Sequence, residues 1–204
     1  SYPGERATIS GGRRITGWTV EDGLWRAHLP EVASGDWWFS VLYVDGALER
    51  PARGPNPEGD PRDKNGDGFF NSGGRVNDET IRYAEEDLRA YRNPEDVLVS
   101  VLHAWDVSYH RLASVDTAAR TVTFQDIVPS SPDSDHAAFA PAEVEQRFAV
   151  YHAYEELDRP GEWWLDRPNG DLYYYPHPGQ TPADTTVVAP RLETLFELHA
   201  SENE

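Results

Sequence analysis

The sequence predicts a mainly β protein, built as an antiparallel barrel or sandwich with long loops and at most one or two short helices. Three observations support this fold class. Short runs rich in Val, Thr, Trp and Tyr recur along the 204 residues and are separated by Gly, Pro, Asn and Asp. Two tight-turn dipeptides, Asp45-Gly46 and Asn169-Gly170, each follow such a run. Helical periodicity is scarce, and only the segment 78–92 carries it.

The elements follow from these local signals. The segment 78–92 is expected to form a short helix, because Asp78 can cap its first turn and Asn93-Pro94 can end its last. The alternative for this segment is an irregular stretch with a short strand at 80–84. The stretches 51–77 and 128–141 are rich in Pro, Gly and acidic residues, which predicts long acidic surface loops. The expected strands are 8–10, 24–28, 38–44, 97–104, 112–116, 121–124, 146–150, 162–165, 171–175 and 186–188.

The stretch 161–176, GEWWLDRPNGDLYYYP, is a strong hairpin signal, because Asn and Gly tolerate the positive φ angles of a tight turn. Strand alternation places Trp164, Tyr173 and Tyr175 on the outer face of this hairpin. These rings could cover a neighbouring strand of the same chain, dock on another part of the protein, or form a platform for a sugar. The inward-facing residues of the two runs are Trp163, Leu165, Leu172 and Tyr174.

Composition excludes several classes of protein. The net charge is −18, and Lys64 is the sole lysine, so the surface repels phosphate backbones and nucleic acid is not an expected partner. The chain has no cysteine, which excludes disulfides and cysteine-based zinc sites. No apolar run approaches the ~18 residues that a membrane span requires. Methionine is absent, including at position 1, so we expect a processed chain or a piece of a longer one.

The motif DKNGDG at 63–68 resembles the first half of a calcium-binding loop. Asp63, Asn65 and Asp67 alternate, which lets their side-chain oxygens converge on a hard cation, and a glycine follows at the sixth place for the sharp turn. The carbonyl of Phe69 would supply the ligand at the seventh place. Position twelve holds glycine instead of the expected glutamate. The sequence therefore indicates calcium, with a solvated Asp/Asn turn as the alternative.

Several phrases of the sequence occur in an order that resembles a known family. They are YPGERATISGGRRITGW, GLWRAHLP, LYVDG with RPARGPNP, LHAWD, LDRPGEWWLDRPNGDLYYYP and LETLFEL. Together they resemble the N-terminal or inserted β domain of secreted right-handed parallel β-helix proteins, which are glycoside hydrolases or sit beside them. The resemblance covers roughly residues 2–198.

The resemblance implies a single β domain over 1–204, located outside the cell or in the periplasm, with an antiparallel core at 8–188. Residues 1–12 and 190–200 would be flanking strands that join the parallel β-helix of a parent chain, which is the expected partner, together with a polysaccharide. Trp105 joins the three hairpin aromatics as a candidate for the carbohydrate or docking face. The catalytic acids of such proteins are expected on the β-helix, so no catalytic residue is assigned here.

The predicted function is a non-catalytic accessory domain that caps the β-helix and shapes the access of glycans. One alternative is a free-standing, calcium-assisted glycan-binding module. Another is a structural domain that self-assembles through edge strands or aromatic faces. The 36 acidic residues make accidental carboxylate pairs unavoidable, so the sequence singles out no acid–base pair for hydrolysis.

Overall fold

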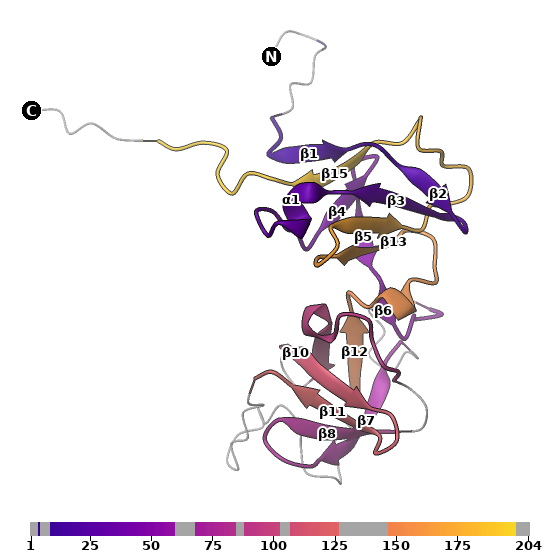
Figure 1. Ribbon diagram of the computed structural model, residues 1–204, viewed down its shortest axis with the longest axis vertical. Helices are drawn as coiled ribbons and strands as arrows, with labels where there is room; N and C mark the ends of the chain where they lie inside the picture. The colour runs from indigo at the N-terminus through magenta and orange to yellow at the C-terminus, as the bar shows by residue number, and fades with distance from the viewer. Residues whose placement is uncertain are drawn as a thin grey trace, which may run out of the picture.

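The computed structural model describes residues 4, 9–59, 68–84, 88–102, 107–126 and 147–198. It confirms the mainly β fold class: a curled sheet lies above a closed six-stranded barrel (Figure 1). The described helical elements are short, namely α1 (Pro30–Ala33), η1 (Pro94–Asp96) and η2 (Tyr154–Glu156). None of the helices in the described part of the chain is long and apolar enough to cross a membrane.

The upper sheet contains eight strands in the order β1-β15-β4-β5-β13-β14-β3-β2. Its pairings are antiparallel except that of β13 with β5, where Glu162 lies opposite Arg50. One face packs Trp25, Trp163 and Tyr174 into a continuous apolar core with the aliphatic residues of β4 and β15. The strands are β1 (Gly12–Ile15), β2 (Thr19–Glu21), β3 (Leu24–His28), β4 (Leu42–Val44), β5 (Ala47–Pro51), β13 (Glu162–Asp166), β14 (Asp171–Tyr174) and β15 (Val187–Pro190).

The lower barrel closes because β12 pairs with both β7 and β9, and β6 adds to β12 outside the ring. Its interior holds a second apolar cluster built around Phe124, Phe148 and Leu112. Because the barrel is closed, each of its six strands pairs with a neighbour on both sides. The strands are β6 (Arg53–Gly54), β7 (Phe70–Arg75), β8 (Thr80–Tyr83), β9 (Leu98–Leu102), β10 (Val107–Asp116), β11 (Thr121–Phe124) and β12 (Arg147–Tyr151).

The expected helix at 78–92 is wrong in the described part of that segment. Residues Thr80–Tyr83 form β8, and the alternative of a short strand is correct. Ile81 and Tyr83 are buried while Arg82 is exposed, which is the two-residue period of a strand. Pairing with β7 and β11 overrides the weak helical pattern because it buries both apolar side chains in the barrel.

The other local predictions differ from the structure at element ends. The first described strand lies at Gly12–Ile15, and the described part of 8–10, residues 9–10, is not in a strand. The segment 38–44 is a strand only from Leu42 onward. The stretch 51–77 contains β6 and β7, so it is not one long loop. The stretch 128–141 and the predicted site residues Asp63, Asn65, Asp67 and Trp105 lie outside the described residues.

The chain passes from the upper sheet to the barrel after β5 and returns after β12. Ala52 joins the two passages: its N–H donates to the Trp163 carbonyl at 2.8 Å, and its own carbonyl accepts from His152 at 2.9 Å. These bonds hold the two sheets at a fixed junction.

Candidate functional site

An exposed tryptophan stands at the junction between the two sheets. The segment 34–41 runs from α1 to β4, and Trp37 and Phe39 within it are buried with their ring centroids 5.1 Å apart. The indole N–H of Trp37 donates to the Pro190 carbonyl at 2.8 Å. Trp38, between these two anchors, points the other way and is 53% exposed. Because both neighbours are fixed in the core, Trp38 is held at the surface with little backbone freedom.

The turn of the β13–β14 hairpin places an arginine beside this ring. Asp166 organises the turn, since its carboxylate accepts from the Asn169 side chain at 2.9 Å and its carbonyl accepts from the Gly170 N–H at 2.7 Å. Gly170 has φ +71°, and a Cβ there would lie 2.5 Å from the Leu29 carbonyl oxygen. The turn therefore requires glycine at this position, and it presents Arg167 to the junction.

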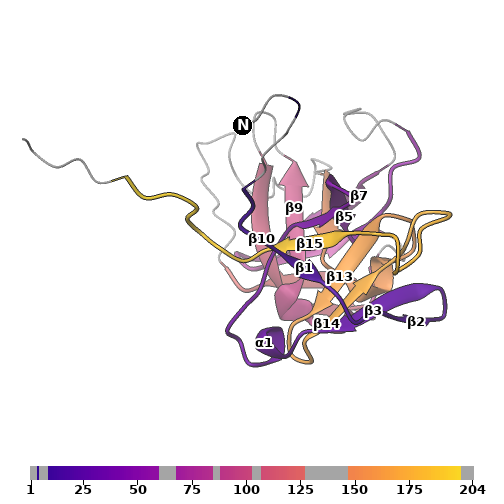
Figure 2. The ribbon, with the colours of Figure 1, turned by 90° about the horizontal axis from the view of Figure 1, so that it is seen from above.

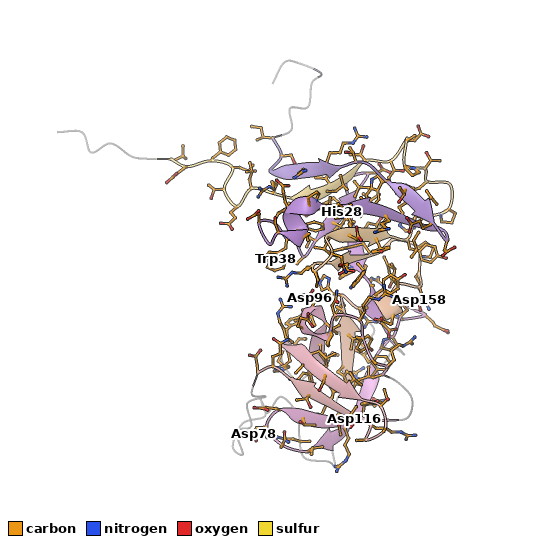
Figure 3. All side chains as sticks on the ribbon, viewed as in Figure 1. His28, Trp38, Asp78, Asp96, Asp116 and Asp158 are labelled. Carbon is orange, nitrogen blue, oxygen red and sulfur yellow. The ribbon has the colours of Figure 1, made fainter. Side chains whose placement is uncertain are left out.

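Arg167 connects the upper sheet to the barrel. Its guanidinium carbon lies 5.2 Å from the centroid of the Trp38 ring, and its Nη1 donates to Oδ1 of Asp96 at 2.6 Å. Asp96 ends η1 and is 8% exposed. Burial raises the pKa of Asp96, and this effect outweighs the opposing attraction of Arg167. Figure 3 shows Trp38 and Asp96 on the same side of the junction, Trp38 from the segment before β4 and Asp96 from η1.

Trp38, Asp96 and Arg167 line two adjoining hollows, which we call the junction groove. The outer hollow has a volume of about 320 Å³ and is walled by α1, the residues that follow it and Glu95. The inner hollow has a volume of about 90 Å³ and reaches His152 and Arg111. The groove thus combines an indole ring, an ion pair between the buried Asp96 and the exposed Arg167, and further polar groups, a combination found in small-molecule sites.

His152 forms part of the floor of the inner hollow. It adopts a positive φ of 60°, which is uncommon outside glycine, and its ring meets the Trp163 ring edge-on at 5.4 Å between centroids. Burial, and secondarily the charge of Arg111, lowers its pKa to about 4. At neutral pH the groove therefore contains a neutral imidazole.

The hairpin itself is confirmed, and its inward set lies in the core as predicted. Trp164 does lie on the opposite face, but it is only 1% exposed. The ring of Tyr154 meets it at 4.9 Å between centroids, and its indole N–H donates to the His152 carbonyl at 3.0 Å. Tyr173 and Tyr175 are half-buried, and Tyr173 joins the same cluster at 5.6 Å from Trp164. Trp164 is therefore covered by neighbouring elements of the same chain, which is the first of the three alternatives given for the outer rings of the hairpin.

Of the four predicted calcium ligands, only Phe69 is described. Its ring lies under two arginines, with Arg53 and Arg147 at 5.3 and 5.2 Å from the centroid. Among the described residues there is no group of three or more His, Asp or Glu side chains that could hold a metal ion. Calcium binding by this loop stays a prediction.

A buried carboxyl group lies near the passage from β12 to β13. Glu162 is 2% exposed, and its Oε2 accepts from the backbone N–H groups of Asp158 and Arg159, both at 3.1 Å. Its Oε1 has no hydrogen-bond partner. Burial raises the pKa of Glu162 to about 7, although backbone N–H groups, those of Arg159 and Asp158 foremost, oppose the rise. Figure 3 shows Asp158 on the side of the junction opposite Trp38.

The outer face of the upper sheet carries apolar side chains at one edge. Val188, Tyr43 and Leu48 lie opposite one another across β15, β4 and β5 and are half-buried or exposed. Beyond β15, the segment 191–198 exposes Leu192, Leu195, Phe196 and Leu198. A hollow of about 520 Å³ lies among Ile9, Tyr43, Val188, Leu192 and Leu195. We call these residues the apolar edge.

Comparison with known proteins gives one informative result. A scan against protein families finds no match, and neither does a search of curated proteins. A solved structure of a glycoside hydrolase is similar to this chain, with a TM-score of 0.67 and 24% identity, over 91% of this chain. The chain has a glycoside hydrolase-like fold. It spans only 32% of that glycoside hydrolase, and at this identity the likeness establishes the fold and not the activity.

Proposed function

We propose that this chain is a non-catalytic accessory domain of a larger, secreted carbohydrate-active protein of the parallel β-helix type. In this role it caps the β-helix and shapes the access of glycans. The observation that carries the proposal is the coverage: 91% of the chain matches a part that makes up 32% of a glycoside hydrolase. Most of the glycoside hydrolase lies outside the matched part. We expect the catalytic region of the parent protein to correspond to this unmatched remainder.

The position of β1 and β15, the first and last strands of the described residues, supports insertion into a longer chain. β1 and β15 are antiparallel neighbours, with Gly12 opposite Pro190, and they run side by side in Figure 2. The carbonyl of Gly11 accepts from the N–H groups of Arg191 and Leu192 at 2.9 and 3.0 Å. A domain whose two connections leave one edge together can be inserted into another fold with little disturbance of either.

The apolar edge supports the same proposal, and we assign it to the β-helix of the parent chain. It lies where the two connections leave the sheet, and β1 is an edge strand. Exposed apolar groups of this kind mark interaction surfaces in proteins. A covering β-helix would remove Leu192, Leu195 and Phe196 from water, and would also protect the free edge of β1.

The junction groove favours a second candidate, a free-standing glycan-binding module. An exposed indole with nearby charged groups suits a sugar whether or not a β-helix is attached. The two candidates differ in how long the natural protein is.

The proposal is tested by an activity comparison. Chain 1–204 and the complete product of its gene are each incubated with a panel of polysaccharides, and the release of reducing ends is measured. We expect no release by chain 1–204 and release by the complete product. Hydrolysis by chain 1–204 would contradict a non-catalytic role, and a complete product that is inactive on every polysaccharide would contradict the carbohydrate-active parent.

A further inference from the structure

We propose that the junction groove binds one neutral sugar residue of a glycan, with Trp38 as the stacking platform and the Asp96–Arg167 pair as the receptor for its hydroxyl groups. The inference rests on the proposed carbohydrate role and adds to it the place of binding and the class of ligand.

The first argument concerns the exposed ring. Trp38 is 53% exposed, whereas the other described tryptophans are buried or half-buried. It lines both hollows, so part of the indole borders open space even though Arg167 lies near its face. A flat ring held between buried neighbours offers apolar area to the C–H face of a sugar and loses little entropy on binding.

The second argument concerns the polar groups. Asp96 and Arg167 are held by one short ion pair at 2.6 Å, which uses Oδ1 of the acid and Nη1 of the guanidinium group. A carboxylate can accept about four hydrogen bonds and a guanidinium group can donate five, so the pair has capacity for further partners. Adjacent sugar hydroxyls both donate and accept, and an acid beside an arginine provides the matching acceptor and donor.

Charge and size narrow the ligand class. The positive charge of Arg167 is balanced by Asp96, and Arg111 donates to the backbone carbonyl of Glu95 at 3.4 Å. The chain as a whole carries a net charge of −18, which repels polyanionic glycans. The outer hollow, at about 320 Å³, lies at the lower end of the range of small-molecule sites. A single neutral sugar residue fits both conditions.

The groove joins the two sheets, and this gives binding a measurable consequence. Trp38 belongs to the segment that leads into β4 of the upper sheet, Arg167 to the turn of the β13–β14 hairpin, and Asp96 to η1 beside the barrel. A ligand that binds the folded chain at these three residues stabilises it, so a bound sugar should raise the unfolding temperature, and the rise should grow with the logarithm of 1 + [sugar]/Kd.

The test uses chain 1–204 and a panel of soluble neutral polysaccharides, with acidic polysaccharides as the comparison. Binding is measured by affinity electrophoresis, and the best oligosaccharide is then titrated by calorimetry. Trp38→Ala should weaken binding by about tenfold or more, as expected for the loss of a stacking ring. Asp96→Asn should also weaken binding. Tyr109→Ala is the matched control, because Tyr109 is 61% exposed on β10 and lines neither hollow.

Three outcomes would overturn the inference: no binding of any neutral glycan, binding that is unchanged by Trp38→Ala, or stronger binding of acidic glycans. The inference and the proposed function fail separately. Trp38-dependent binding by a protein that exists only as this chain would support the groove and contradict the accessory role. An active longer protein whose glycan binding is unchanged by Trp38→Ala would support the accessory role and contradict the groove.

Discussion

Replacement of Glu162 by glutamine should stabilise the fold, and the gain should depend on pH. The side chain is 2% exposed, and its Oε1 has no partner. A glutamine keeps an oxygen for the N–H groups of Asp158 and Arg159, and its amide cannot ionise. The variant therefore resembles the protonated acid at every pH.

The magnitude follows from the pKa. Burial raises the pKa of Glu162 from 4.5 to about 7, and each pKa unit between the folded and unfolded states is worth about 1.4 kcal/mol. The folded state binds this proton more tightly, so its stability contribution is full below pH 4.5 and is lost as the pH rises through about 7. The loss corresponds to about 3 kcal/mol.

The assay is urea denaturation of the natural chain and Glu162→Gln across this pH range. The free energy of unfolding of the variant relative to the natural chain should rise by about 3 kcal/mol between pH 4.5 and pH 7. His152 acts in the opposite direction, since its lowered pKa gives stability that is present above pH 6.5 and is lost as the pH falls to about 4. Its effect is common to both proteins and cancels in the difference. A difference that does not vary with pH would refute the reasoning.

Three further predictions concern the turn, the core and the acidic loop. Gly170→Ala should lower the free energy of unfolding by about 2 kcal/mol or more, because φ is +71° and the added Cβ meets the Leu29 carbonyl. Thermal denaturation measures this free energy, and a value for the variant within about 0.5 kcal/mol of that of the natural chain would contradict the prediction. Trp163→Ala should cost about 3–5 kcal/mol in urea denaturation, since the ring is fully buried, and a smaller cost would show that the core closes over the gap. Calcium should raise the unfolding temperature above its value in chelator, and Asp67→Asn should reduce this rise. An unfolding temperature of the natural chain that is the same in calcium and in chelator would contradict the predicted site.

The hairpin was predictable because its signals are local. Asn169-Gly170 and the alternation of the flanking aromatics determine which rings face the core, and the structure agrees. The partners of Trp164 were not predictable in the same way. Arg92 is far from Trp164 along the chain, and Tyr154 lies in a separate element, η2. Their contacts with the Trp164 ring depend on the tertiary fold, which the local sequence of the hairpin does not reveal.

The groove escaped prediction for a related reason. Trp37, Trp38 and Phe39 are all aromatic, so no change between apolar and polar residues marks the exposed ring. Asp96 and Arg167 are 71 residues apart, and neither stands out among the many charged residues. In the segment 78–92 the error was a helix predicted from a weak local pattern. Residues Thr80–Tyr83 form a strand instead, because they pair with β7 and β11 in the barrel.

The size of the natural protein is the most direct test of whether this chain is a domain of a larger carbohydrate-active protein. An antibody raised against chain 1–204 can isolate the protein from its source, and mass spectrometry then gives its intact mass and peptides. We predict a mass well above the 23.0 kDa of this chain, with peptides that continue into a repetitive β-helix sequence. A natural protein of 23.0 kDa would contradict the accessory role and leave the free-standing glycan-binding module.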